Sequence, residues 1–299
     1  MHRKSFDPRR YIDEVAFWLR LSKYFYKAFD LSRNLGPQYF LINSLLEAPK
    51  RTSTVSDLST TLQTFSAIGK NATSDISILL EDLRKLQYVK ILAKSEAGEE
   101  AIELRTTKTE RYLPAEATVQ IRPELELGRA DYTGQVMEEL FGREVSDAQS
   151  AASSIIMQKT FEFVVTKYLP NWSELLEHIS VHSAALGKTG KGAIKKKLLA
   201  STEYFILLHC LWEASLQRGG IREVSLKRLK ASADFARPIK LSKFTTCILF
   251  LESQNVVRRK AELVQLDARL DIFFDEYAVK FVEMRPMLRD HLSRNLCLY

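Results

Sequence analysis

Cysteine and histidine are scarce in this sequence of 299 residues, which contains three cysteines and five histidines. An odd number of cysteines without a C-x-x-C pair argues against a disulfide framework and against a cysteine zinc site. Cys210 and Cys247 lie in apolar runs, which predicts buried and inert thiols. The i, i+4 pair His178 and His182 fits an amphipathic helix more simply than a metal site. We therefore expect no metal.

Long hydrophobic runs and catalytic signatures are also missing. No apolar segment approaches the roughly 20 residues of a membrane-spanning helix, so we expect a cytoplasmic protein with no membrane partner. A Gly-Lys-Thr run begins at Gly187, but His182 stands where a phosphate-binding loop needs its first glycine. G-x-S-x-G and dinucleotide fingerprints are absent from the sequence. The sequence predicts no enzyme and no cofactor.

Basic residues are what the sequence does have in excess. The composition is that of an ordinary globular chain, with 45% hydrophobic and 27% charged residues, but the formal net charge is +7. Between positions 218 and 243 the basic residues outnumber Glu223 and Asp234: Arg218, Arg222, Lys227, Arg228, Lys230, Arg237, Lys240 and Lys243. Such a stretch favours a phosphate-bearing partner, although a solvated charged face would look similar.

Two stretches of the chain, residues 39–89 and 204–257, resemble each other. Each begins with an apolar helix pattern and continues through a Val-Ser segment, at Val55 in the first stretch and at Val224 in the second. Each ends in a helix that leads into a strand, as LRKLQYV and as LESQNVV. Matched positions lie about 165 to 170 residues apart, and self-similarity at a fixed offset indicates duplication. We predict two copies of one module.

Each copy is predicted to consist of helices followed by a hairpin. In the first copy we expect a helix over 7–32, the repeat helix from 39, a short helix from 55, a longer helix over 70–88 and a hairpin over 89–106. Residues 115–154 contain scattered prolines and glycines and are predicted to connect the copies, with one short amphipathic helix around Met137, Leu140 and Phe141. We expect the second copy's entry helix to be interrupted at Pro170. A closing helix over 268–293 is expected to kink at Pro286.

The longer helix of the first copy has two different sides. Leucine and isoleucine recur at helical spacing between Ile76 and Leu86, and the other side is polar, small or basic. Such side chains suit entry into the major groove of DNA, because amides, hydroxyls and guanidinium groups can bond with base edges. An ordinary solvated face fits them equally well. The predicted DNA-binding residues of this copy are Thr54, Ser56, Lys70, Asn71, Thr73, Ser74, Ser77, Arg84, Lys94 and Arg105.

The second copy repeats this arrangement over residues 240–252. Phe244, Ile248 and Leu251 are predicted to pack inward. Strands at 256–260 and 262–266 leave room for a short hairpin only. The predicted DNA-binding residues of this copy are Lys227, Arg228, Arg237, Lys240, Ser242, Lys243 and Thr246.

The element order, with LRKLQYV entering the hairpin and LRTTKTER at 104–111 leaving it, resembles the MarR-type winged helix-turn-helix regulators. This chain has Leu86-Gln87 where a glycine commonly precedes the hydrophobic pair. The resemblance implies a mainly α fold with small β-hairpin wings and long terminal helices. It divides the chain into a first module (1–114), a connector (115–154) and a second module with a C-terminal helix (155–299).

That resemblance also implies a function. MarR-type proteins pair through their terminal helices, so this chain is expected to be a monomeric pseudodimer or a weak homodimer. The resemblance further implies that it binds double-stranded DNA, associates with the nucleoid and regulates transcription. A small aromatic or phenolic effector is a further partner that the resemblance implies. Because the two copies present different side chains, the DNA site is expected to be asymmetric.

Two other functions remain open from the sequence. Plasmid replication initiators also resemble two winged helices in tandem, and they bind repeated origin sequences. A winged-helix scaffold that binds protein rather than DNA is the second alternative, which the short second hairpin favours and the basic stretch opposes.

Overall fold

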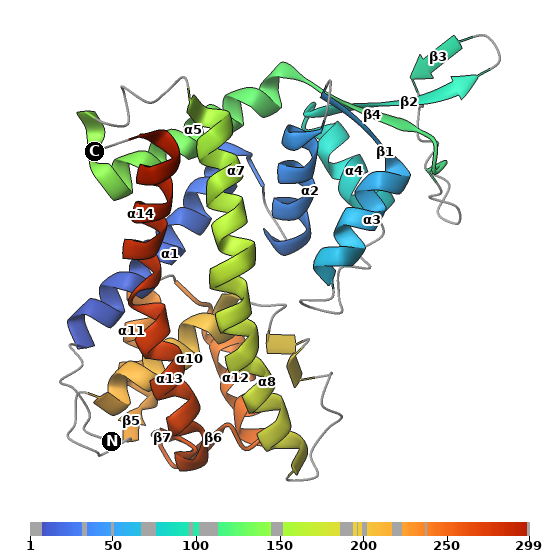
Figure 1. The fold of residues 1–299 in the computed structure, drawn as a ribbon. Helices are drawn as coiled ribbons and strands as arrows, with labels where there is room; N and C mark the ends of the chain where they lie inside the picture. Colours follow the sequence, from blue (N-terminus) through green and yellow to red (C-terminus); the bar gives the residue numbers. More distant parts are fainter. Residues whose placement is uncertain are drawn as a thin grey trace. The chain divides into compact units, whose positions relative to one another are not determined.

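The computed structural model describes residues 8–31, 35–48, 51–66, 76–95, 98–101, 113–144, 152–185, 194–195, 197–198, 202–216, 223–236 and 238–297. The fold is mainly helical, and the described residues include two small antiparallel sheets (Figure 1). The predicted class, mainly α with small β-hairpins, is confirmed at this level.

The chain forms two compact units that are interleaved in sequence. The first-copy unit comprises the described residues within 21–164 and 288–299, and the second-copy unit those within 1–20 and 165–287. This division differs from the predicted boundaries. The reason is that α1 (Pro8–Ala28) and α14 (Met284–Leu296) each contribute turns to both units, as a long helix can bury different turns in different cores.

The described part of the first-copy unit between residues 35 and 121 combines three helices with a four-stranded sheet whose strand order is β1-β4-β2-β3 (Figure 1). Its elements are α2 (Leu35–Glu47), β1 (Thr52–Thr54), α3 (Val55–Ser66), α4 (Ile76–Lys85), β2 (Val89–Ser95), β3 (Gly98–Ala101) and β4 (Thr118–Ile121). Strands β2 and β3 form the predicted hairpin, with Ser95 opposite Gly98. The returning part predicted over 102–106 lies outside the described residues.

Strand β4 and the following α5 (Pro123–Phe141) come from the predicted connector. Val119 is fully buried, and β4 pairs with both β1 and β2. Pro123 lies in the first turn of α5, where its missing N–H costs nothing. A Cβ atom on Gly128 would lie 2.7 Å from the Phe29 ring, so this glycine permits close packing. These residues thus contribute a strand and a helix to the first-copy unit, and the helix is longer than the short one predicted, because here proline and glycine mark a helix start and a tight contact.

The second-copy unit repeats the order of helix, strand, two helices and two strands. Its elements are α10 (Thr202–Leu216), β5 (Glu223–Ser225), α11 (Leu226–Ala236), α12 (Leu241–Ser253), β6 (Val257–Lys260) and β7 (Leu263–Leu266). Its three strands lie in the order β5-β7-β6. The predicted short hairpin is confirmed, since a two-residue turn, Ala261-Glu262, joins β6 to β7.

Helices α4 and α12 end in the same way, which supports the duplication. Gln87 and Asn255, which the two copies align, both have positive φ, at 59° and 55°. The next residue in each unit donates its N–H to a carbonyl five positions earlier, at 2.9 Å: Tyr88 to Leu83 and Val256 to Leu251. This is the Schellman type of helix end.

The predicted Val-Ser match requires a correction. The Thr54 hydroxyl accepts the Asp57 N–H at 3.0 Å, and the Ser225 hydroxyl accepts the Arg228 N–H at 3.2 Å. These hydroxyls are equivalent caps of α3 and α11. Val224 therefore lies in β5, not in a helix, and its alignment with Val55 was wrong by two residues.

Each helix predicted to be interrupted at a proline is interrupted just before it. The irregular π-helical turn η3 (Val164–Tyr168) precedes α8 (Leu169–Ala185), and Pro170 lies within the first turn of α8. After η4 (Ala268–Leu270) and α13 (Asp271–Phe281), the closing helix breaks before Pro286. Proline cannot donate to the carbonyl four residues earlier, and that Val282 carbonyl accepts from the Arg10 guanidinium at 3.4 Å instead.

Aromatic side chains fill both cores. Phe25, Phe29, Tyr39 and Tyr132 cluster in the first-copy unit, and Tyr11, Trp172, His209, Tyr277 and Phe281 in the second-copy unit. Burial lowers the pKa of His209 to about 3, so its ring is neutral. Cys210 and Cys247 are buried as predicted, and burial raises the pKa of Cys210 to about 12.

Candidate nucleic-acid interface

The basic segment of the second-copy unit forms two successive helices, α11 and α12, joined by a short turn. The Asp234 carboxylate, near the end of α11, accepts a hydrogen bond from the Ile239 N–H at 2.9 Å and pairs with the Lys230 ammonium. Ile239 is itself buried. One side chain therefore ties the end of α11 to the start of α12.

Helix α12 separates its apolar and polar sides as the sequence predicts. Phe244, Ile248 and Leu251 are buried. The four predicted contact residues at its start are all exposed: Lys240, Ser242, Lys243 and Thr246. The Thr246 hydroxyl donates to the Ser242 carbonyl at 2.9 Å, so its oxygen remains an acceptor. The exposed side also includes Leu241, at 69% exposure, and Leu249, which give it an apolar component.

Positive charge accumulates where both helices begin. Lys227 and Arg228 are exposed in the first turn of α11, and neither helix has an acidic residue in its first turn. Lys240 makes no side-chain cap bond to α12. The N-terminal end of a helix is already positive, so lysine there costs stability, by about 0.3–1 kcal/mol per charge. The same arrangement attracts a phosphate.

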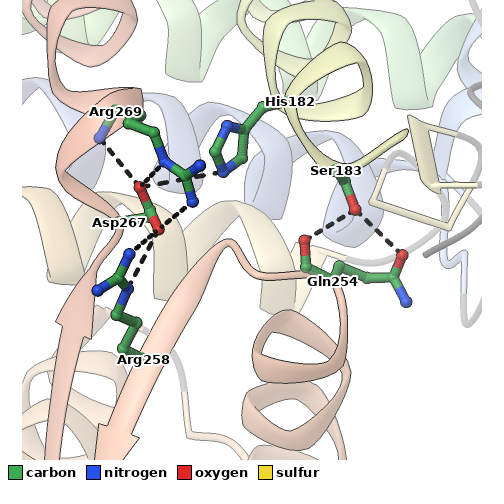
Figure 2. Close-up of polar contacts among 6 residues, drawn as sticks. All are labelled: His182, Ser183, Gln254, Arg258, Asp267 and Arg269. Carbon is green, nitrogen blue, oxygen red and sulfur yellow. Dashed lines mark hydrogen bonds and ion pairs between the residues drawn. The ribbon is translucent and has the colours of Figure 1, made fainter. Parts of the chain in front are cut away.

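The hairpin β6–β7 and the following turn η4 each add one arginine that the sequence did not single out. Arg258 on β6 and Arg269 on η4 both approach the Asp267 carboxylate, at 3.2 and 3.0 Å (Figure 2). Asp267 is 2% exposed, whereas both arginine side chains are more than half exposed. Hydrogen bonds from Arg269 hold the pKa of Asp267 well below its usual range. A buried carboxylate thus orients two exposed guanidinium groups, and the trio keeps a net positive charge.

Contacts with α8 also hold the hairpin in place. The Ser183 hydroxyl donates to the Gln254 carbonyl at 2.8 Å, at the turn between α12 and β6 (Figure 2). His182, the neighbouring residue on α8, approaches Asp267 to 4.0 Å. These contacts set the position of the hairpin relative to α12. In the sequence, only the run Arg258-Arg259-Lys260 hinted at this surface.

The matching surface of the first-copy unit is less basic in its described part. Ser56 is exposed at the start of α3, but the Thr54 hydroxyl is engaged as the cap and donates to Asp57 at 2.7 Å. Arg84 makes two hydrogen bonds to Glu81, at 2.8 and 3.0 Å. A first-turn acidic residue, Asp57, also reduces the positive potential at the start of α3.

Ser77 is a correction to the predicted contact residues. It is 6% exposed and lies on the buried side of α4, while its neighbour Ile78 is 39% exposed. Helix α4 is turned about its axis relative to the prediction, since a small serine can pack against the core more closely than isoleucine. Ser77 is therefore not positioned to contact a base.

Several predicted contact residues lie outside the described residues, namely Lys70, Asn71, Thr73, Ser74, Arg105 and Arg237. Lys94 belongs to β2, and its side chain is likewise not described. Their roles stay predictions.

The histidines of α8 have aromatic and ionic neighbours. His178 stacks on Phe273 with ring centroids 4.0 Å apart.

No group of three or more His, Cys, Asp or Glu side chains that could hold a metal occurs among the described residues. Within the same residues, no helix has both the length and the apolar character needed to span a bilayer.

Comparisons of the chain with protein-family models, with curated proteins and with solved structures found no significant match.

Proposed function

We propose that this chain is a sequence-specific, double-stranded DNA-binding regulator of transcription that uses two non-identical winged-helix modules. The order of helix, strand, two helices and paired strands, present in both units, is the order of winged helix-turn-helix modules such as the MarR type. In that reading α4 and α12 are the recognition helices, and β2–β3 and β6–β7 are the wings.

The observation that carries the proposal is the positive charge at the start of α12. Lys240 and Lys243 are exposed, and they have no ion pair with another residue of the described chain. Two lysines at the positive end of a helix lower the stability of the free protein. A bound polyanion such as DNA would neutralise them. Ser242 and Thr246, on the same side, supply hydroxyls for base edges or phosphates.

The remaining basic residues extend this surface along neighbouring elements. Lys227 and Arg228 on α11 suit phosphate contacts on one side of α12, and Arg258 suits a contact from the wing. The pairing of Arg258 with Asp267 holds the guanidinium in place before DNA arrives, which reduces the side-chain entropy lost on binding.

The two modules differ, so the proposed DNA site is asymmetric. The start of α12 carries Lys240 and Lys243, which have no ion pair within the described residues, whereas Arg84 on α4 is bound to Glu81 and Ile78 is exposed. The second-copy unit therefore contributes more of the salt-dependent affinity. One chain supplies both modules, as a monomeric pseudodimer or a weak homodimer.

Selection of bound duplexes from a random-sequence pool, followed by footprinting, tests the proposal. We expect one enriched, asymmetric site. Lys240→Ala with Lys243→Ala should abolish the enrichment. The matched control, Lys167→Ala with Lys280→Ala, removes the same charge from η3 and α13 and should leave it intact.

Two other outcomes would replace the proposal. Enrichment of tandemly repeated sites, combined with origin activity in a plasmid assay, would favour a replication initiator. No enrichment at any salt concentration would favour a winged-helix scaffold that binds protein.

A further inference from the structure

The first-copy unit contains a pocket of about 730 Å³ among α2, β1, α3, β4 and Phe161 of α7 (Ser153–Phe163). Its volume is that of a site for a small organic molecule. Phe161 forms an aromatic wall and is held by Tyr39 and Phe40, with ring centroids 5.5 and 5.7 Å away.

The charge of the lining is negative. Glu47 and Asp57 both line the pocket, and its described lining includes no lysine, arginine or histidine. Partial burial raises the pKa of Glu47, against the opposing influence of Arg129. A desolvated carboxylate gains from a nearby cation. An anionic phenolate or carboxylate would instead meet two negative groups.

A buried acceptor marks the inner wall. Asn43 lines the pocket and is 1% exposed. Its amide nitrogen donates to the Tyr39 carbonyl at 2.7 Å, which fixes the orientation of the amide. The amide oxygen is buried and has no hydrogen-bond partner among the described residues. Leaving such an acceptor unpaired costs about 1–3 kcal/mol, and a ligand N–H or O–H donor would remove that cost.

From these features we propose that the pocket binds an organic amine in its protonated form. The ammonium group lies between the Glu47 and Asp57 carboxylates, a donor group of the ligand bonds with the Asn43 amide oxygen, and an apolar or aromatic body packs on Phe161. The inference does not rest on DNA binding, because the pocket lies within the first-copy unit and its occupancy can be measured without DNA.

The pocket has a direct connection to α3. The Asp57 carboxylate accepts the Thr54 hydroxyl at 2.7 Å, and the Thr61 hydroxyl donates to the Asp57 carbonyl at 3.0 Å. An ammonium bound at Asp57 therefore acts on the residue that caps α3. Amine binding is expected to alter the exchange of amide protons in the first turn of α3.

Isothermal titration of the full chain with tyramine, phenethylamine and spermidine, without DNA, tests the proposal. 3-(4-Hydroxyphenyl)propionate serves as the matched anion, since it replaces the ammonium of tyramine with a carboxylate. We expect saturable binding of at least one amine, with Kd below about 1 mM, and no binding of the anion. Failure of all three amines, or equal binding of the anion, overturns the proposal.

Two variants locate the site. Glu47→Gln removes one charge with little change of volume, and Asn43→Leu removes the unpaired acceptor. Each should weaken amine binding about tenfold. Glu124→Gln, an exposed position on α5 outside the pocket lining, is the control and should bind like the wild type. Unfolding curves of the Asn43→Leu protein separate a folding defect from loss of the site, and unchanged amine affinity in both pocket variants would contradict this location.

Discussion

The Asp234 carboxylate accepts the backbone N–H of Ile239 at 2.9 Å and so closes the turn between α11 and α12. This hydrogen bond from Ile239, and to a smaller extent the hydrogen bond from the Lys230 ammonium, lowers the pKa of Asp234 below its ordinary value. A lowered folded-state pKa means that the stabilisation is present above the ordinary aspartate pKa. It is lost as the pH falls through the lowered value.

Asp234→Ala is expected to loosen this turn while leaving the cores intact. The Ile239 amide should exchange its proton faster at neutral pH, because its acceptor is gone. Asp234→Asn keeps an amide oxygen for this bond and should exchange at an intermediate rate. Hydrogen exchange followed by NMR measures both, with Glu276→Ala on α13 as the control for loss of one exposed acidic charge. Equal exchange in all four proteins would mean that Asp234 does not hold the turn.

Glu14 introduces a pH dependence into the second-copy unit. Its carboxylate accepts the Trp18 indole N–H at 2.8 Å and the Arg285 backbone N–H at 2.9 Å. Burial raises its pKa from 4.5 to about 7 despite these bonds. Because the folded-state pKa is the higher one, its contribution to stability is fully present below about pH 4.5 and declines as the pH rises through about 7.

Glu14→Gln should remove that decline, since glutamine keeps the acceptor oxygen and carries no charge. We expect the variant to gain stability over the wild type between pH 5 and 8, by up to about 3 kcal/mol. Urea unfolding at a series of pH values measures the difference. A wild-type stability that stays level through this range would show that Glu14 has an ordinary pKa.

Gln87 has a strained backbone, with φ of 59°. Left-handed geometry costs an L-residue roughly 1–2 kcal/mol, and glycine avoids most of that while losing more chain entropy. Gln87→Gly is therefore expected to raise the free energy of unfolding by about 0.5–1 kcal/mol. Gln87→Val should lower it, because a β-branched side chain tolerates this region poorly. A glycine variant less stable than the valine variant would refute the strain.

Local patterns in the sequence predict most of the helices and both hairpins. The helical spacing of leucine and isoleucine indicates α4 and α12, and the apolar runs from Tyr39 and Tyr204 indicate α2 and α10. Gln87 and Asn255 lie at matching helix ends, yet neither is the glycine that usually signals such an end. The similarity of the two stretches therefore lies in the spacing of their elements more than in residue identity.

Tertiary pairing accounts for the errors. Residues 115–154 are predicted as a connector with one short helix near Met137, because Pro123 and Gly128 are common in loops. Strand β4 is defined by its pairing with β1 and β2, which lie far from it in the sequence. The sharing of α1 and α14 between units is equally non-local, since a periodic apolar pattern does not say which core it enters.

In the candidate interface, too, the sequence predicts what depends on local spacing and misses what depends on tertiary packing. The exposed residues at the start of α12 follow from periodicity alone, and their exposure agrees with the prediction. Ser77 was predicted to be exposed but is buried, because the rotation of α4 about its axis depends on what packs against it. Arg269 is placed by Asp267 as the cap of η4, which is a local relationship, whereas Arg258 reaches the same carboxylate across the hairpin, a pairing that no spacing rule predicts.

The central claim is that the start of α12 neutralises DNA phosphates, and the salt dependence of duplex binding tests it most directly. Affinity should fall steeply and linearly on a log–log plot of binding constant against salt concentration. In the Lys240→Ala, Lys243→Ala protein the slope should be shallower by about 2, one unit per lost phosphate contact. The Lys167→Ala, Lys280→Ala control should keep the wild-type slope. A flat salt dependence, or equal slopes in all three proteins, would contradict the account.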